Sequence, residues 1–226
     1  ATKNGLMKKT TLESYSRPRA NGIIALGLRE DDRLIRVTLT DGNSQMLVAS
    51  YNGKVVRFPE DTVRPMGRTA TGVRAIKLDE DGKDRVIGMI CVEQGSKDSV
   101  LVISEKGFGK RTLLDDENGE PIYRITNRGG KGVKTMNITD KTGNLIGLEA
   151  VNDDMDLMLI TKAGTAIRMA MDAISVLGRA TQGVKLIELQ KRNDTLMFGC
   201  TVPKEEQEEM AESEEVTTEE TTTTEE

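Results

Sequence analysis

Short apolar runs recur along the chain with lengths that fit β-strands. They are five to eight residues long, rich in Val, Ile and Leu, and bounded by Gly, Asn or Asp. The predicted strands are residues 33–39, 45–50, 54–58, 72–78, 98–104, 144–151, 156–161 and 183–189. Two of them are joined at Asn52-Gly53, which predicts a tight hairpin over residues 45–58.

An internal repeat organises these strands. Four segments, "NGLMKKT" (4–10), "NGKVVRF" (52–58), "KGFGKRT" (106–112) and "AGTAIRM" (163–169), share a glycine followed four positions later by Lys or Arg. A second segment follows each of them: "RPRANGIIAL", "GRTATGVRAI", "NRGGKGVKTM" and "GRATQGVKLI". The shared glycines are Gly5, Gly53, Gly107 and Gly164, which lie 48, 54 and 57 residues apart. About four short strands per repeat indicate the blades of a propeller-like array.

We therefore predict an all-β fold, a β-pinwheel array of about four blades of antiparallel strands over residues 1–203. The repeat units cover about residues 1–30, 31–80, 84–140 and 144–190, and a final strand at 195–202 is left over after the fourth unit. The first unit lacks its two leading strands, so we expect the ring to be incomplete and the chain to be a fragment. No helix longer than about two turns is expected.

The net charge of −5 conceals two regions of opposite sign. Residues 204–226 contain eleven Glu and a single Lys, whereas residues 1–203 contain 31 Lys and Arg against 26 Asp and Glu. The tail has almost no apolar side chains, so it is predicted to be disordered. We also expect it to compete with nucleic acid for the basic surface of the body.

Composition excludes several classes of protein. His and Trp are absent, which rules out a Ser-His-Asp triad and a propeller of the WD type. Cys91 and Cys200 have no second cysteine nearby, so a zinc knuckle is excluded and a reducing, cytoplasmic compartment is favoured. No apolar run reaches the roughly 18 residues of a membrane span. "GFGKRT" (107–112) lacks the first glycine of a P-loop, and "DEDGKD" (79–84) lacks calcium-ligand spacing, so we assign no catalytic residue, metal or cofactor.

The repeated glycines and basic residues point to phosphate binding. Glycine lets the backbone approach a phosphate while a neighbouring guanidinium binds the same oxygens. The candidate DNA-binding residues of the first segments are Lys9, Arg57, Arg111 and Arg168, and those of the second segments are Arg17, Arg19, Arg68, Arg74, Arg128, Lys131, Lys134, Arg179 and Lys185. We expect the second set to dominate DNA affinity, and the first to contribute packing as well as charge.

The repeats resemble a known family. "ATKNGLMKKTTLESYSRPRANGIIAL" (1–26), "NGKVVRFPEDTVRPMGRTATGVRAIKL" (52–78), "GFGKRT" (107–112) and "AGTAIRMAMDAISVLGRATQGVKLI" (163–187) are similar to blades of the C-terminal DNA-wrapping domain of the bacterial DNA gyrase A subunit, and of its topoisomerase IV relative. The resemblance covers residues 1–203 and implies the later blades of a six-bladed β-pinwheel. "RGGKG" (128–132) resembles the end of the gyrase signature "QRRGGKG", but it stands in the third unit here, so we interpret it as the equivalent loop of a later blade.

The resemblance also implies a function. It implies sequence-nonspecific binding and wrapping of duplex DNA in the cytoplasm, on the chromosome. The partners it implies are the gyrase B subunit, together with the rest of the gyrase A subunit, in an A2B2 assembly that supercoils DNA with ATP and Mg bound on other domains. Tyr15, Tyr51 and Tyr123 lack the surroundings of a cleavage tyrosine, so none is assigned to catalysis. The equivalent C-terminal domain of topoisomerase IV and a protein-interaction propeller remain as alternatives.

Overall fold

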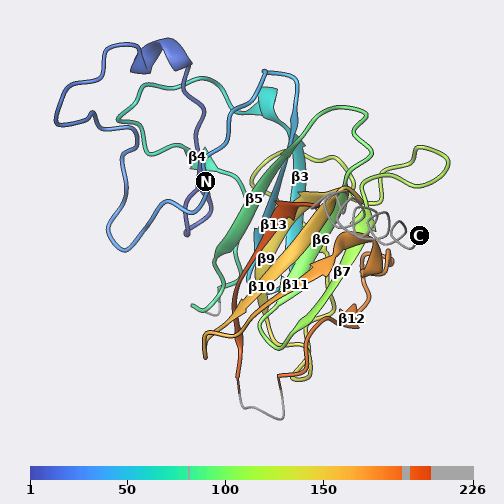
Figure 1. Cartoon of the computed structure of the whole chain (residues 1–226). Helices are drawn as coiled ribbons and strands as arrows, with labels where there is room; N and C mark the ends of the chain where they lie inside the picture. The colour runs from blue at the N-terminus through green and yellow to red at the C-terminus, as the bar shows by residue number, and fades with distance from the viewer. Residues whose placement is uncertain (81, 190–193, 205–226) are drawn as a thin grey trace, which may run out of the picture.

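The computed structural model describes residues 1–80, 82–189 and 194–204, and it confirms the all-β prediction (Figure 1). The described helical segments are three short 3-10 turns, η1 (Leu12–Tyr15), η2 (Glu60–Thr62) and η3 (Met171–Ala173). The strands are β1 (Leu6–Met7), β2 (Gln45–Ser50), β3 (Lys54–Pro59), β4 (Val73–Arg74), β5 (Val86–Val92), β6 (Ser99–Ser104), β7 (Phe108–Leu113), β8 (Val133–Lys134), β9 (Leu145–Val151), β10 (Met155–Thr161), β11 (Ala166–Ala170), β12 (Val184–Lys185) and β13 (Leu196–Pro203). The acidic tail lies outside the described residues, apart from Lys204.

Three larger sheets are each built around a hairpin. Their strand orders are β5-β2-β3-β8, β9-β6-β7-β12 and β13-β10-β11, and a small fourth sheet pairs β1 with β4. All of these pairings are antiparallel. The hairpin predicted over residues 45–58 is the β2–β3 pair, with Val48 opposite Val56.

Each four-stranded sheet draws strands from two successive repeat units. The hairpin β2–β3 comes from unit 31–80, whereas its flanking strands β5 and β8 come from unit 84–140. The next sheet repeats this arrangement, because β6 and β7 belong to unit 84–140 while β9 and β12 belong to unit 144–190. A blade is therefore not the same as a repeat unit. In the second, third and fourth units, the second segment supplies a short strand, here called a donated strand, that pairs with a strand of the preceding unit: β4 with β1, β8 with β3 and β12 with β7.

The hydrophobic core runs between neighbouring blades. One buried cluster brings together Leu47 of β2, Ile90 of β5, Val102 of β6 and Leu148 of β9, all at most 4% exposed. Two further clusters lie on either side of it, one around Phe58 and one around Leu159. Because apolar burial is shared across the sheets, the blades stabilise one another.

Two sequence predictions about strands are corrected. Residues 33–39 form no strand; only Leu34 makes an isolated bridge, to Thr2, and Val37 and Leu39 are 72% and 75% exposed. This run has no partner strand among the described residues, unlike β5, which pairs along β2. Conversely, the strand at 195–202 is not left over: it is β13, which pairs along the full length of β10 and belongs to the third hairpin sheet.

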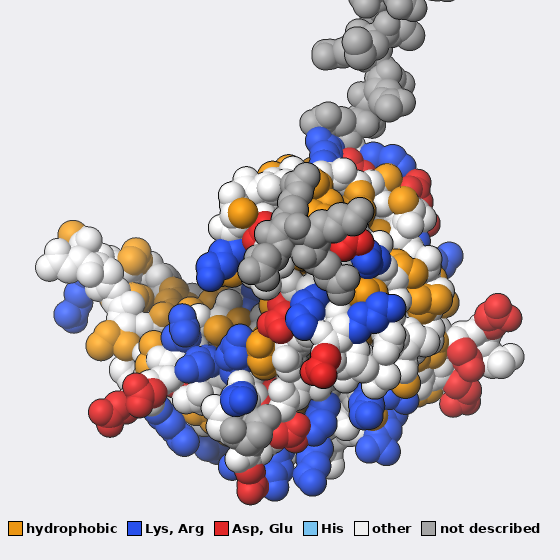
Figure 2. Space-filling model, turned by 90° about the horizontal axis from the view of Figure 1, so that it is seen from below, with side chains coloured by type: hydrophobic (Ala, Val, Ile, Leu, Met, Phe, Trp, Pro, Cys, Tyr) orange, Lys and Arg blue, Asp and Glu red, His pale blue; other side chains and the backbone are white. Residues whose placement is uncertain are grey.

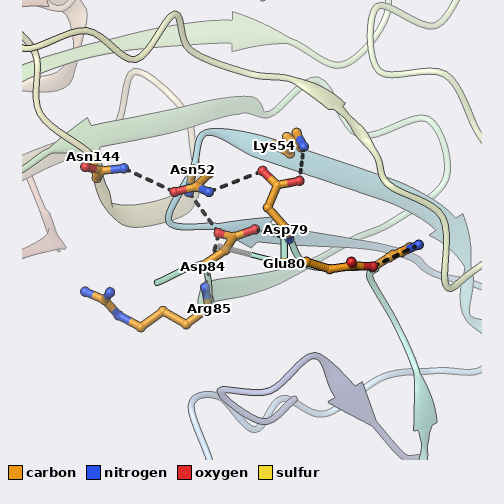
Figure 3. A network of polar contacts seen from close by, with 8 residues as sticks. Asn52, Lys54, Asp79, Glu80, Asp84, Arg85 and Asn144 are labelled. Atoms are coloured by element: carbon orange, nitrogen blue, oxygen red, sulfur yellow. Dashed lines mark hydrogen bonds and ion pairs between the residues drawn. The ribbon is translucent and has the colours of Figure 1, made fainter. Parts of the chain in front are cut away.

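Asp79 and Asp84 brace a hairpin (Figure 3). The Asp84 carboxylate accepts hydrogen bonds from the backbone N–H of Asn52 at 3.0 Å and of Asp79 at 2.9 Å. Asp79 in turn accepts from the Asn52 side chain at 3.2 Å and forms an ion pair with Lys54. Both carboxylates point at the tip of the β2–β3 hairpin, so the role of Asp79 and Asp84 is structural.

Candidate nucleic-acid interface

Two of the four basic residues predicted in the first segments, Arg57 and Arg111, are buried. Arg57 of β3 is only 5% exposed, and its guanidinium donates to the carbonyl oxygens of Leu114 at 3.0 Å and Tyr123 at 3.2 Å. An ion pair of 2.7 Å to Asp115 compensates its charge. Arg57 therefore ties its blade to the loop of the next one, and its donors are consumed inside the protein.

The equivalent residues repeat this arrangement to differing degrees. Arg111 is 8% exposed, donates to the carbonyl oxygen of Ile174 at 2.9 Å and pairs with Asp153. We withdraw Arg57 and Arg111 from the DNA-contact set, because both side chains are buried and their Nε and Nη1 atoms are bound to acceptors within the protein. Lys9 donates to the Glu60 carbonyl at 3.1 Å, and Arg168 pairs with Asp156 at 2.8 Å; both retain some exposed surface.

The loop arginines Arg68, Arg128 and Arg179 form contacts between units. Each Nη1 donates to the carbonyl oxygen at one equivalent position of the preceding unit: Arg68 to Ile24 at 2.9 Å, Arg128 to Arg74 at 3.4 Å and Arg179 to Lys134 at 2.8 Å. The Nε atoms of Arg128 and Arg179 also donate to the Thr62 and Ile122 carbonyls, each at 3.0 Å. These half-buried side chains were expected to be free for DNA; instead they fasten one loop to the next.

Two lysines hold the same loops from inside. The Lys110 side chain is fully buried, and its ammonium donates to the carbonyl oxygens of Gly178 and Arg179, the latter at 2.7 Å. Lys8, at the equivalent position of the first unit, donates to the carbonyls of Gly67 at 3.0 Å and Arg68. Burial, reinforced by the positive charge of Arg179, lowers the pKa of Lys110 from 10.5 to about 8.

The free basic surface lies on the short donated strands. Arg74 of β4, Lys134 of β8 and Lys185 of β12 occupy one register and are all exposed, so each carries a cation at the same place on successive blades. Among the described residues, Arg74 and Lys134 have no hydrogen-bonding or ionic side-chain partner, whereas Lys185 pairs with Glu188 at 2.6 Å. Three other candidates, Lys131, Arg17 and Arg19, are also exposed.

Arg64 and Arg124 were missed by the sequence reasoning. Both are exposed, and neither has a side-chain partner in the described part of the chain. Each stands four residues before a loop arginine. The residue that follows each of them forms an isolated β-bridge with a basic residue of a first segment: Pro65 with Lys9, and Ile125 with Arg57. Arg64 and Arg124 could have been identified from the sequence by aligning the repeats over this loop as well as at the glycines.

The charge distribution suits an extended polyanion better than a small ligand. Figure 2 shows Lys and Arg side chains along the rim of one face, interspersed with Asp and Glu. Within the described residues there is no group of three or more Asp, Glu, Cys or His side chains placed to hold a metal ion. None of the described helical segments has the length and hydrophobicity to cross a membrane.

Comparisons with known proteins agree with this geometry. Residues 1–41, 45–93, 98–152 and 156–198 match the family described as "DNA gyrase C-terminal domain, beta-propeller". The chain is 47% identical over 189 residues to the DNA gyrase A subunit of Staphylococcus aureus strain MRSA252, which covers 84% of this chain and 20% of that relative; strain NCTC 8325 gives the same values. The chain thus spans about a fifth of the length of these curated relatives.

Solved structures show the same fold. The C-terminal domain of DNA topoisomerase IV superposes with a TM-score of 0.80 at 22% identity, covering 90% of this chain and 60% of that one. A DNA gyrase A C-terminal domain superposes with a TM-score of 0.75, also at 22% identity, covering 89% and 64%. The two structures confirm the pinwheel but do not separate gyrase from topoisomerase IV, whereas the matched family and the curated relatives do: the chain belongs to the DNA gyrase C-terminal domain family.

Proposed function

We propose that the chain binds duplex DNA along its rim without sequence preference and wraps it, as the C-terminal part of a DNA gyrase A subunit. The observation that carries the proposal is the repetition of exposed cations, Arg74, Lys134 and Lys185, at one register on three successive blades. Arg64 and Arg124 add a second pair of exposed cations at one position of the repeat. A row of cations on a curved edge is suited to follow a bent phosphate backbone.

The contacts are expected to be made with phosphates and not with bases. The described residues contain no α-helix to enter a major groove, and their basic side chains stand on short strands and loops. Bending DNA over a short segment costs on the order of 1–6 kcal/mol, so several phosphate contacts are needed to offset it. Repetition over successive blades provides such contacts at regular intervals.

The larger assembly belongs to the same proposal. As part of the gyrase A subunit, the chain works with the gyrase B subunit in an A2B2 complex, in the cytoplasm and on the chromosome. It supports ATP-dependent negative supercoiling by that holoenzyme, a type IIA topoisomerase. We place ATP, Mg and the cleavage chemistry on other parts of the complex. In this proposal the chain directs the path of the DNA and supplies no catalytic residue or cofactor.

Filter binding of linear duplex DNA over a range of salt tests the proposal. Neutralising about five phosphates gives a log–log slope near −4 to −5. The double variant Arg74→Ala/Lys134→Ala is expected to weaken binding to all sequences alike and to reduce the slope by about 2. The matched control, Lys97→Ala/Lys162→Ala, removes two exposed cations from turns outside the second segments and should leave the slope unchanged. Binding that is independent of salt, or equal losses in both doubles, would refute the proposal.

A further inference from the structure

An exposed apolar residue recurs at one position of successive blades. Three residues, here called the bridging residues, each form an isolated parallel β-bridge to the basic residue of a first segment: Pro65 to Lys9, Ile125 to Arg57 and Val176 to Arg111. The backbone N–H that follows each bridging residue donates to the carbonyl oxygen of that basic residue, at 2.8, 2.9 and 2.8 Å respectively. The backbone is therefore fixed in the same way at all three positions.

The bridging residues lie on the outer edge of the sheets, beside the exposed cations. One edge of β3 pairs with β2, so the bridge between Ile125 and Arg57 falls on the other edge, which pairs with β8. Lys134 of β8 stands on this edge three strand positions from the bridge, a separation of about 10 Å. On β7 the same register brings Val176 and Lys185 to one edge. Each edge thus carries a cation and an apolar residue close together.

The exposure of the bridging residues is not a property of the ends of the array. Ile125 is 44% exposed although its sheet packs against another sheet on either side, and Val176 is 47% exposed. Apart from Leu113, the other large apolar side chains that are exposed lie in residues 12–39 or on β13, at the two ends. A single exposed apolar residue is ordinary, but repetition at one position of neighbouring blades indicates a contact surface.

The neighbouring charges indicate that this surface contacts DNA. Arg64 and Arg124 directly precede Pro65 and Ile125, and both are exposed without a side-chain partner in the described part of the chain. A protein with an apolar surface would have to desolvate these cations without pairing them. A duplex offers both kinds of partner, because its phosphates alternate with sugars whose carbon atoms line the grooves.

We propose that Ile125 and Val176, with Pro65 at the equivalent position, pack against deoxyribose sugars in the minor groove of the wrapped duplex. This contact rests on the proposed function and adds to it a part of the affinity that does not depend on salt, because burying apolar surface releases no counterions. Apolar side chains in a minor groove also favour a bent duplex, since the bend brings more of the DNA against the protein.

Filter binding over a range of salt separates this contact from the phosphate contacts. Ile125→Ser/Val176→Ser keeps every charge, so DNA affinity is expected to fall about tenfold at each salt concentration without a change of slope. Ile125→Val/Val176→Ile retains apolar side chains and should bind like the parent. So should the matched control Met197→Ser/Phe198→Ser, which changes two exposed apolar residues on β13, at the opposite edge of its sheet from β11. Thermal unfolding verifies that all the variants are folded.

Energy transfer between dyes on the two ends of a short duplex tests the bend at saturating protein. The parent should bring the ends together, and Ile125→Ser/Val176→Ser should do so less, because fewer contacts offset the cost of bending. The sugar contact is overturned if this variant matches the parent in affinity and bend, or if it changes the salt slope; a parent that binds with the expected slope would then still support the proposed function. A parent that binds no DNA would overturn both.

Discussion

At the scale of the residue, exposure separates the buried Arg57 from the exposed Arg64, which we propose contacts DNA. Arg57→Ala removes the hydrogen bonds to the Leu114 and Tyr123 carbonyls and the ion pair with Asp115, so we expect it to lower the free energy of unfolding by about 2–4 kcal/mol. Arg64→Ala removes an exposed cation and is expected to change stability by less than about 0.5 kcal/mol while reducing the DNA salt slope by about 1. Denaturant titration measures the stability of both variants, and filter binding measures their salt slopes. If Arg57→Ala reduced the salt slope without loss of stability, Arg57 would belong to the DNA-contact surface after all.

Lys110 makes stability depend on pH. Its folded pKa of about 8 lies below its ordinary value of 10.5, so between these values the unfolded chain binds more protons than the folded one. The contribution of this lysine to the free energy of unfolding therefore increases from about pH 8 to pH 10.5. Lys110→Met, which keeps the length of the side chain without its charge, is expected to lack this rise in denaturant titrations at matched pH. A parent and a variant with parallel pH profiles would contradict the assignment.

At the scale of the element, the close approach of donated strands explains their glycines. Gly132 has φ +72°, and an added Cβ would collide with the carbonyl oxygen of Val55, so Gly132→Ala should displace β8 and cost about 2–4 kcal/mol. Gly119 has a similar φ of +80° but open space around it, so Gly119→Ala should cost only about 1–2 kcal/mol. Amide exchange locates the damage: only Gly132→Ala should release the Thr135 N–H from the Gly53 carbonyl. Equal losses of stability in the two variants would show that backbone strain at positive φ, and not the contact with Val55, determines both losses.

The same scale shows how far the sequence could predict the structure. Local patterns were sufficient for the hairpins, because short apolar runs and Asn-Gly turns are encoded within a few residues, as at Asn52-Gly53. They were not sufficient for the donated strands: the two-residue strand β8 is defined only by its partner β3, so its membership of the preceding blade has no local signal. The contacts of Arg128 and Arg179 are hidden for the same reason, since their acceptors are backbone carbonyls of a different unit.

At the scale of the whole molecule, charge divides the chain into a basic body and an acidic end. Residues 205–226 hold eleven Glu and no Lys or Arg, so ending the chain at Lys204 changes its formal net charge from −5 to +6. If the acidic end competes with DNA for the basic body, truncation should strengthen DNA binding, and because salt screens the attraction between charges, the gain should be largest at low salt. We expect filter binding to show tighter DNA binding by the truncated chain at low ionic strength, and convergence of the two chains as salt rises.

A chain in which the eleven tail Glu are changed to Gln keeps the length of the tail and isolates the effect of its charge. If competition by charge is the mechanism, this variant should bind DNA like the truncated chain, because it no longer carries anions to occupy the sites of Arg74 and Lys134. If it binds like the parent while the truncated chain binds more tightly, the tail acts by occupying space. Equal affinity of all three chains at low salt would show that the acidic end does not compete with DNA at all.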